Sequence, residues 1–170
     1  AVASAPWGSA MLLPITYGYI KMLGGNGLRR ATEMAIVNAN YMSSALAPEY
    51  RTYYSGETGR VGHEMILDLT SFKKGYNIDC GDIAHPTLSF PVHETLMVEP
   101  TESEPKAEMD RFIEALVSIK RECEAAAGQA DNVVANAPHT AVEIAGEWTH
   151  PYTRAEAAFP LAWVREAKFF

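Results

Sequence analysis

The side chains with the widest chemical repertoire lie near the end of the chain. His139, His150, Tyr152 and Arg154 follow one another there among prolines and aromatic residues, without helical or strand periodicity. Irregular segments often carry binding and catalytic residues, because a rigid scaffold can hold them in place. We therefore take His139 and Arg154 as candidate substrate-binding residues.

Arg154 has two interpretations, which the sequence leaves open. A guanidinium group can hold a small carboxylate through two parallel hydrogen bonds. Arg154 can equally form a surface ion pair with the nearby Glu147 or Glu156.

A second pair with chemical potential is His63 followed by Glu64. Alternating apolar residues predict a strand over residues 60–69, so neighbouring side chains there point to opposite faces. The two groups then cannot act on one substrate atom. His63 shares its face with Met65 and Leu67, and we expect it to be a buried core histidine.

Trp7, Gly8 and Ser9 come directly before a predicted helix. Glycine lets a ligand approach the backbone closely, and the first turn of a helix offers free N–H groups to an anion. The competing interpretation is an ordinary helix cap by Ser9 beside a buried tryptophan.

The composition argues against several classes of protein. A net charge of −7 over 170 residues disfavours nucleic acid or an anionic membrane as the main partner. Cys80 and Cys123 are too few for a disulfide framework or zinc cluster, and no histidine pair has metal-ligand spacing, so no metal site is predicted. The apolar run at residues 10–20 is too short to span a bilayer and follows no basic region, so we expect neither a membrane span nor secretion.

Periodicity and turn signals predict the elements that must position these residues. The first half is predicted to contain a helix at 9–23, a glycine-rich break at 24–27, a helix at 28–46 ended by Pro48, the strand at 60–69, and a loop at 71–81. The helix at 28–46 carries one stripe of residues at helical spacing: Leu28, Ala31, Ala35, Asn38, Met42 and Ala45. The second half is predicted to contain strands at 87–92 and 95–99 and a helix that follows the capping signature Thr101-x-x-Glu104 and runs to 127. These elements predict a small α+β domain at residues 49–128. Residues 1–48 would be linking helices toward a large domain outside the chain, and residues 129–170 an irregular C-terminal arm.

Several strings of residues resemble the P-protein family, the glycine decarboxylases of the glycine cleavage system. They are Ala5-Pro6-Trp7-Gly8-Ser9-Ala10, Ile36-Val37-Asn38-Ala39-Asn40-Tyr41, Gly59-Arg60-Val61-Gly62-His63-Glu64, Pro86-Thr87-Leu88-Ser89-Phe90-Pro91-Val92, Thr95-Leu96-Met97-Val98-Glu99-Pro100-Thr101-Glu102-Ser103-Glu104, Ala137-Pro138-His139 and His150-Pro151-Tyr152. They occur in the family's order and cover nearly the whole chain. The chain resembles the C-terminal portion of that family.

The resemblance implies a fold-type I enzyme that depends on pyridoxal phosphate (PLP), with this chain as its small C-terminal domain. Such an enzyme decarboxylates glycine and passes the aminomethyl group to the lipoyl arm of the H-protein. Trp7, Gly8 and Ser9 would then lie near the cofactor, and the partners would be the rest of the P-protein and lipoylated H-protein. The family is found in the mitochondrial matrix of eukaryotes and in the bacterial cytoplasm.

The resemblance also implies that the Schiff-base lysine lies before residue 1. The six lysines of the chain all fit solvated surface positions, so no catalytic residue is predicted within it: Lys21, Lys73, Lys74, Lys106, Lys120 and Lys168. The family has roughly two further turns of helix, at about 3.6 residues per turn, between Ala84 and His85. Two interpretations stay open: part of a working glycine decarboxylase, or a structural subunit derived from the P-protein that does no chemistry.

Overall fold

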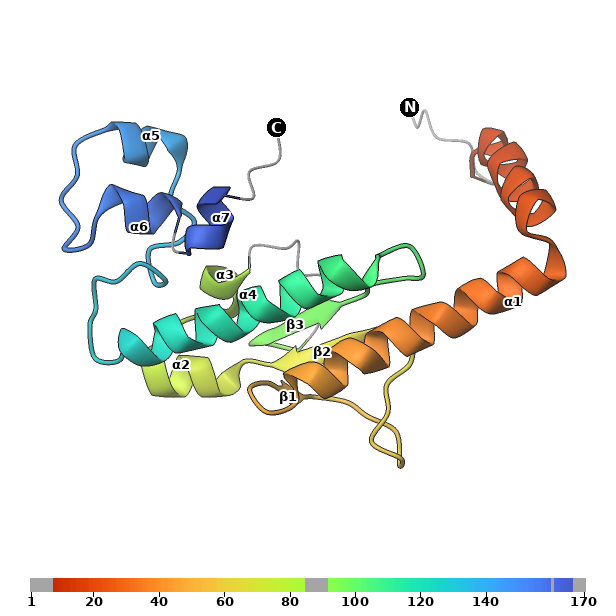
Figure 1. Ribbon diagram of the computed structural model, residues 1–170, viewed down its shortest axis with the longest axis horizontal. Helices are drawn as coiled ribbons and strands as arrows, with labels where there is room; N and C mark the ends of the chain where they lie inside the picture. Colours follow the sequence, from red (N-terminus) through yellow and green to blue (C-terminus); the bar gives the residue numbers. More distant parts are fainter. Residues whose placement is uncertain (1–7, 85–91, 160, 167–170) are drawn as a thin grey trace.

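The computed structural model describes residues 8–84, 92–159 and 161–166 as a small α+β fold (Figure 1). Its elements in chain order are η1 (Ala10–Leu12), α1 (Leu13–Leu46), β1 (Arg51–Thr52), β2 (Met65–Asp68), α2 (Thr70–Tyr76), α3 (Cys80–Ile83), β3 (Thr95–Val98), α4 (Lys106–Ala125), α5 (Ala141–Ala145), α6 (Arg154–Ala158) and α7 (Ala162–Glu166). The predicted α+β class is confirmed. The predicted strand at 87–92 falls largely outside the described residues.

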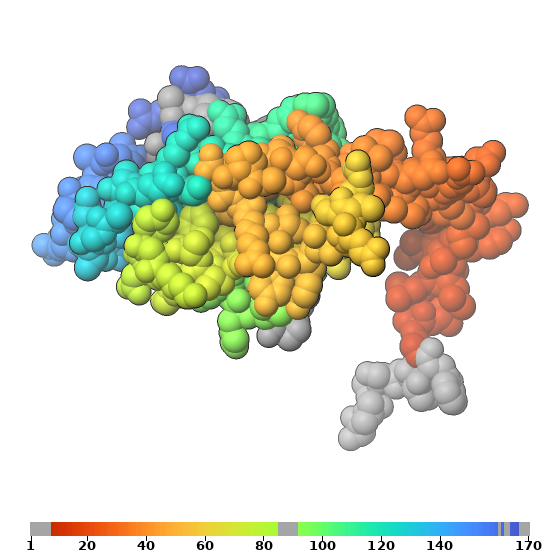
Figure 2. Space-filling view, turned by 90° about the horizontal axis from the view of Figure 1, so that it is seen from below, coloured from red at the N-terminus to blue at the C-terminus, as the bar shows by residue number. Residues whose placement is uncertain are grey.

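Helix α1 bends sharply at Gly24, whose φ of 61° and ψ of −179° interrupt the helical backbone. Only glycine adopts this conformation without strain, so the predicted glycine-rich break is confirmed at its first residue. The helix resumes at once after Gly24. Pro14 lies in the first turn of α1, where its missing N–H costs nothing. Residues 8–23, which we call the N-terminal arm, project away from the rest of the molecule (Figures 1 and 2).

The sheet has three antiparallel strands in the order β1-β2-β3. Leu67 of β2 lies opposite Leu96 of β3. The predicted strand at 60–69 is confirmed only at Met65–Asp68. Before it, the side chain of Asn40 in α1 replaces a neighbouring strand: its Nδ2 donates to the Val61 carbonyl at 2.8 Å, and its Oδ1 accepts from the Val61 N–H at 3.1 Å.

The core lies between the sheet, the second half of α1, and α4. Met42 and Leu46 of α1, Leu67 of β2 and Leu116 of α4 are all buried there. The predicted apolar stripe of α1 is confirmed at Ala35, Asn38 and Met42, whereas Ala45 is exposed and Leu46 takes its place.

The predicted loop at 71–81 is wrong, because α2 and α3 occupy it. Phe72 is buried and stacks on Tyr50 with ring centroids 5.3 Å apart, which holds α2 against the core. Asn77 ends α2 in the left-handed conformation. This segment is helical although its sequence is mostly polar, because the buried Phe72 ring holds α2 against the core.

The predicted capping box at Thr101 and Glu104 is also wrong. Helix α4 begins at Lys106 after Pro105, and Thr101 has a φ of 55°, outside the range of a helix cap. The Thr101 carbonyl instead accepts a hydrogen bond from Asn38 Nδ2 at 2.9 Å. A contact with α1 therefore fixes this loop and delays the start of α4.

Candidate functional site

Four rings from residues 139–152 gather in one place at the end of the chain. Tyr152 stacks on His150 with centroids 5.0 Å apart, and Trp148 lies 4.9 Å from His150. His139 meets Tyr152 edge to face at 5.6 Å. We call His139, Trp148, His150 and Tyr152 the ring cluster. The structure thus joins His139 to residues that the sequence placed only in a common irregular arm.

Hydrogen bonds fix the rings of this cluster. His139 Nε2 and the Tyr152 hydroxyl lie 2.8 Å apart, and Asn136 Nδ2 donates to the same hydroxyl at 3.1 Å. Trp148 Nε1 donates to the Tyr152 carbonyl at 2.6 Å. His150 Nδ1 lies 3.0 Å from Asp131 Oδ1, a carboxylate-to-imidazole contact that can fix the tautomer of the ring.

Burial sets the protonation of the inner pair. Desolvation lowers the pKa of His139; Glu143 opposes this shift and His150 adds to it. Desolvation also raises the pKa of Tyr152. Near neutral pH the pair is therefore a neutral imidazole hydrogen-bonded to a protonated phenol, an arrangement that can pass or hold one proton.

Arg154 lies beside the cluster, 5.5 Å above the Trp148 ring. Its Nε donates to the Ile144 carbonyl at 3.0 Å and its Nη2 to the Gly146 carbonyl at 2.7 Å. The guanidinium thus satisfies carbonyls at the end of α5. In the part of the chain that the structure describes, Arg154 forms no ion pair, so the interpretation as a surface pair with Glu147 or Glu156 is wrong.

Residues 129–166, which we call the C-terminal arm, contain short helices that were not predicted from the sequence. Thr140 and Thr153 cap α5 and α6, each with a glutamate three residues later that bonds back to the cap. The signal was present in the sequence as Thr140-x-x-Glu143 and Thr153-x-x-Glu156. Val134, buried among the core residues, ties the arm to the domain.

The other predicted site lies far from this one. Gly8 and Ser9 stand at the start of η1 in the N-terminal arm, at the opposite side of the molecule from α5 and α6 (Figure 1). Both are exposed, and the Ser9 side chain makes no capping hydrogen bond. Trp7 lies outside the described residues. The structure therefore does not bring Gly8 and Ser9 together with His139 and Arg154.

His63 is not the core histidine expected from the sequence. Its side chain is 58% exposed, and its Nε2 lies 3.9 Å from a carboxylate oxygen of Glu64 and 3.6 Å from one of Glu99. The reason is that the strand begins only at Met65, so strict alternation does not hold at residues 63 and 64. These two side chains come within reach of each other after all.

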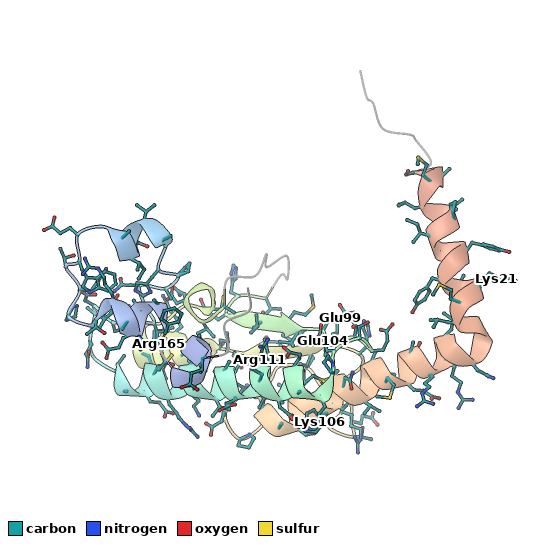
Figure 3. The ribbon with its side chains drawn as sticks, turned by 45° about the horizontal axis from the view of Figure 1, so that its top comes forward. Lys21, Glu99, Glu104, Lys106, Arg111 and Arg165 are labelled. Carbon is teal, nitrogen blue, oxygen red and sulfur yellow. The ribbon has the colours of Figure 1, made fainter. Side chains whose placement is uncertain are left out.

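Carboxylates hold three of the described lysines. Lys73 pairs with Asp79 at 2.5 Å, Lys106 with Asp110 at 2.7 Å and Lys120 with Glu49 at 2.5 Å. In each case the hydrogen bond to that carboxylate is the largest cause that raises the pKa of the ammonium. Lys21 and Lys74 are exposed, and Lys21 lies out on the N-terminal arm (Figure 3).

Lys168 lies outside the described residues. No helix in the described ranges is both long and apolar enough to cross a bilayer. Within residues 8–84, 92–159 and 161–166, no three His, Cys, Asp or Glu side chains are grouped to hold a metal ion.

Comparison with known proteins identifies the chain's relatives. Residues 31–139 match the profile described as "Glycine dehydrogenase, C-terminal domain". Proteins named glycine dehydrogenase (decarboxylating) from Nostoc sp. (strain PCC 7120) and Nostoc punctiforme are 51% and 50% identical to it over 184 aligned positions. The protein of that name from Yersinia pestis (strain Pestoides F) is 50% identical over 183.

Each alignment covers 100% of this chain but only 19% of the relative, so the chain spans about a fifth of the length of the curated proteins that it matches. The alignment of 184 positions also exceeds the 170 residues of the chain, so the two sequences differ by insertions. The chain belongs to the glycine dehydrogenase C-terminal domain family and corresponds to the C-terminal portion of the P-protein.

Proposed function

We propose that this chain supplies the small C-terminal domain of a PLP-dependent, fold-type I glycine decarboxylase. The enzyme decarboxylates glycine and passes the aminomethyl group to the lipoyl arm of the H-protein. The observation that supports this proposal is the identity of about one residue in two across the whole chain with proteins named glycine dehydrogenase (decarboxylating). Its compartment would be the cytoplasm in a bacterium and the mitochondrial matrix in a eukaryote.

The described residues do not fit the covalent anchor of PLP. A Schiff-base lysine must lose its proton readily, and it does so where burial or a neighbouring cation lowers its pKa. Lys73, Lys106 and Lys120 have raised pKa values because each is held by a carboxylate. We therefore propose that polypeptide outside this chain supplies the anchor.

The chain would instead contribute binding groups once the enzyme is assembled. Arg154 uses two of its five N–H donors on backbone carbonyls, which leaves others to reach the carboxylate of glycine. His139, kept neutral by burial, can share one hydrogen bond with the substrate without adding a charge. Trp7, Gly8 and Ser9 would contribute on the cofactor side, with Gly8 in a conformation (φ 83°) that favours glycine. Because Gly8 and Ser9 lie at the opposite side of the molecule from α6, this part of the proposal requires the N-terminal arm to change its direction on assembly.

Reconstitution tests the proposal. The chain is mixed with the part of the Nostoc protein that it does not cover, and absorbance from bound PLP is recorded at roughly 330–430 nm together with release of carbon dioxide from glycine. Both signals are expected in the assembly and neither in the chain alone. An assembly that forms without either signal would overturn the proposal and support the alternative, a structural subunit without chemistry.

The matched variants are Arg154→Ala and Arg30→Ala, since Arg30 is exposed on α1. Loss of a charged hydrogen bond predicts that Arg154→Ala weakens glycine binding by about tenfold or more while PLP content is unchanged. Arg30→Ala should change neither. Equal loss of glycine and PLP in Arg154→Ala would mean that Arg154 only holds the arm together.

A further inference from the structure

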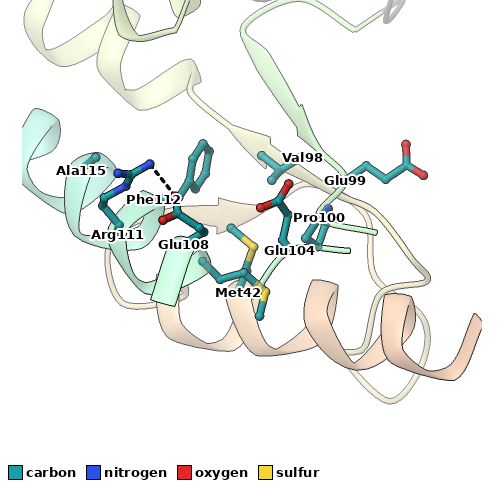
Figure 4. A pocket seen from close by; sticks show the side chains of 10 residues that line it. Met42, Val98, Glu99, Pro100, Glu104, Glu108, Arg111, Phe112 and Ala115 are labelled. Atoms are coloured by element: carbon teal, nitrogen blue, oxygen red, sulfur yellow. Dashed lines mark ion pairs between the residues drawn. The ribbon is translucent and has the colours of Figure 1, made fainter. Parts of the chain in front are cut away.

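The hydrogen bond between His139 and Tyr152 can run in either direction, because an imidazole nitrogen and a phenol can each donate or accept. In most polar contacts the residue types fix the direction. The pair of Arg111 and Glu108, beside the cavity between α1, β3 and α4 (Figure 4), is an example, since a guanidinium only donates and a carboxylate only accepts. At His139 the direction decides which ring nitrogen carries the proton, so it depends on what else surrounds the Tyr152 hydroxyl.

The side chain of Asn136 lies against that hydroxyl. Its Nδ2 atom is 2.7 Å from Asp131 Oδ1 and 3.0 Å from the Asn132 carbonyl oxygen. A carboxylate and a carbonyl are acceptors only, so the atom between them must be the amide NH2 and cannot accept a proton. The same nitrogen is 3.1 Å from the Tyr152 hydroxyl, which therefore cannot donate to it. Within the described ranges, His139 Nε2 is the acceptor left for the phenol proton.

The acidities of the two groups favour the same direction. A phenol is a stronger acid than a neutral imidazole, and an imidazole nitrogen is a stronger base than a phenol oxygen. When Tyr152 donates to Nε2, the neutral ring of His139 carries its own proton on Nδ1. A neutral histidine in water prefers the opposite form, with the proton on Nε2. The hydrogen bonds around His139 thus select the less common tautomer.

The other ring nitrogen of His139, Nδ1, is accessible from outside. It has no hydrogen-bond partner in the part of the chain that the structure describes, whereas every fully buried side-chain nitrogen and oxygen there has one. The loop that carries Asn136 is firmly held, because the buried Asn132 accepts the N–H groups of Val134 and Ala135 through its Oδ1 and Val134 lies in the core. A fixed scaffold therefore stands behind one accessible ring nitrogen.

We propose that Asn136 and Tyr152 are positioning residues that hold His139 in the Nδ1–H form, so that this N–H donates to a carboxylate oxygen of the ligand. The choice of ligand, glycine, rests on the proposed function, whereas the tautomer follows from the hydrogen bonds of this chain alone. Asp131 supports the arrangement twice. Its Oδ1 accepts from Asn136 and lies 3.0 Å from Nδ1 of His150, the ring on which Tyr152 stacks.

Nitrogen-15 NMR of the whole 170-residue chain measures the tautomer directly. Protonated and unprotonated ring nitrogens differ widely in chemical shift, and the signals that His139→Gln removes are those of His139. At about pH 8, above the ordinary histidine pKa of about 6.5, we expect a protonated Nδ1 and an unprotonated Nε2 for His139. A ring that carries its proton mainly on Nε2 would overturn the proposal.

Two variants test the positioning residues. Tyr152→Phe removes the phenol proton and keeps the ring, so His139 should return mainly to the Nε2–H form. Asn136→Asp replaces a donor with an acceptor that can take the phenol proton, so it should shift His139 in the same way. Tyr17→Phe, on the exposed N-terminal arm, is the matched control and should change no histidine signal. An Nδ1–H form of His139 that persists in either of the first two variants contradicts the proposal.

His150 serves as an internal control for folding of the C-terminal arm. Its Nδ1 faces the Asp131 carboxylate, which only accepts, so His150 carries its proton on Nδ1 while the arm is folded. In Tyr152→Phe we expect His139 to change and His150 to stay as it is. A change of both histidines together would mean that the hydroxyl only holds the arm in shape, and the positioning role would be lost.

The choice of ligand is tested in the reconstituted assembly. Tyr152→Phe is expected to weaken glycine binding about fivefold, as for the loss of one well-oriented hydrogen bond, with PLP absorbance unchanged, and Tyr17→Phe should alter neither. Unchanged glycine affinity in Tyr152→Phe would refute the assignment of Nδ1 to the ligand. An unmodified assembly that does not decarboxylate glycine would instead overturn the proposed function, because the tautomer is measured on the chain by itself.

Discussion

The two arms of this molecule extend from the same core but differ in how far their side chains are paired within the chain. The polar groups and rings of the C-terminal arm find partners within the arm. Its rings contact one another, its short helices have local caps, and Arg154 donates to its backbone carbonyls. The N-terminal arm exposes a series of large side chains, namely Met11, Leu12, Leu13, Ile15, Tyr17, Tyr19, Ile20, Met22 and Leu23. Its one side-chain link to a distant part of the described chain joins Tyr19 to Glu102 at 3.3 Å.

The difference indicates which arm would gain more from a partner. A continuous apolar surface on a helix is typical of an interface, because burying it is the main gain available to such a helix. A polar and aromatic cluster with satisfied hydrogen bonds gains little from further burial. If residues 1–48 link this domain to a large domain, as the sequence predicts, that domain would cover the N-terminal arm, whereas the C-terminal arm is preformed.

The largest loss of stability is expected from a substitution in the core, which serves as the reference for a substitution in the N-terminal arm. Leu67→Ala should lower the free energy of unfolding by about 2–5 kcal/mol, because Leu67 is fully buried. Leu13→Ala, in the N-terminal arm, should lower it by less than about 0.5 kcal/mol, because Leu13 is 68% exposed. Urea unfolding followed by circular dichroism measures both. A large effect of Leu13→Ala would show that the arm already has a partner within the chain.

A smaller, local effect should separate the two arms directly. Tyr152→Phe removes the hydroxyl that bonds His139 and Asn136, so it should reduce the protection of C-terminal arm amides from hydrogen exchange by about 1 kcal/mol. Tyr17→Phe makes the same chemical change on the exposed N-terminal arm and should alter no protection. Equal effects at both positions would contradict the contrast between a preformed arm and an unpartnered one.

The smallest effect is a pH dependence confined to the C-terminal arm. Burial lowers the pKa of His139, so the unfolded arm takes up a proton more readily than the folded arm. The arm should therefore be unaffected above the ordinary histidine pKa of about 6.5 and lose stability as the pH falls through it. Trp148 fluorescence, with Trp148→Phe as the blank, reports this loss.

His139→Gln should remove the response between about pH 7 and about pH 5. His93→Gln, at an exposed position, should leave it intact. A response that survives His139→Gln would place the titrating group elsewhere.

Much of the fold could be predicted where local signals and tertiary contacts agree. The bend at Gly24, the end of α1 before Pro48, the buried stripe at Ala35 and Met42, and strand β3 all occur as expected. Helix α2 could not be predicted, because its polar sequence is stabilised by burial of Phe72 against distant residues.

The candidate site was predicted only in part. His139 and Arg154 do lie close to a common cluster, yet no sequence pattern indicates that Tyr152 bonds His139 or that Arg154 donates to backbone carbonyls. Such contacts depend on how α5 and α6 fold back on each other. The periodicity rule misplaced His63 because a strand needs a neighbour, and Asn40 takes that position beside Val61.

One local pattern shows how far a sequence motif can predict a helix cap. Threonine followed three residues later by glutamate occurs at Thr101, Thr140 and Thr153, and it caps a helix at the last two only. At Thr140 and Thr153 the local hydrogen bonds with Glu143 and Glu156 form the cap. At Thr101 a hydrogen bond from Asn38, 63 residues earlier, fixes the carbonyl, and the backbone turns to a φ of 55°.

The sequence by itself therefore determined the family, the α+β class and those boundaries that depend on glycine, proline and periodicity. The tertiary structure alone decided which caps form, which histidine is exposed and which side chains form the ring cluster. The physical reason is that a local hydrogen bond contributes about 1 kcal/mol, so a single contact between distant segments is enough to override it.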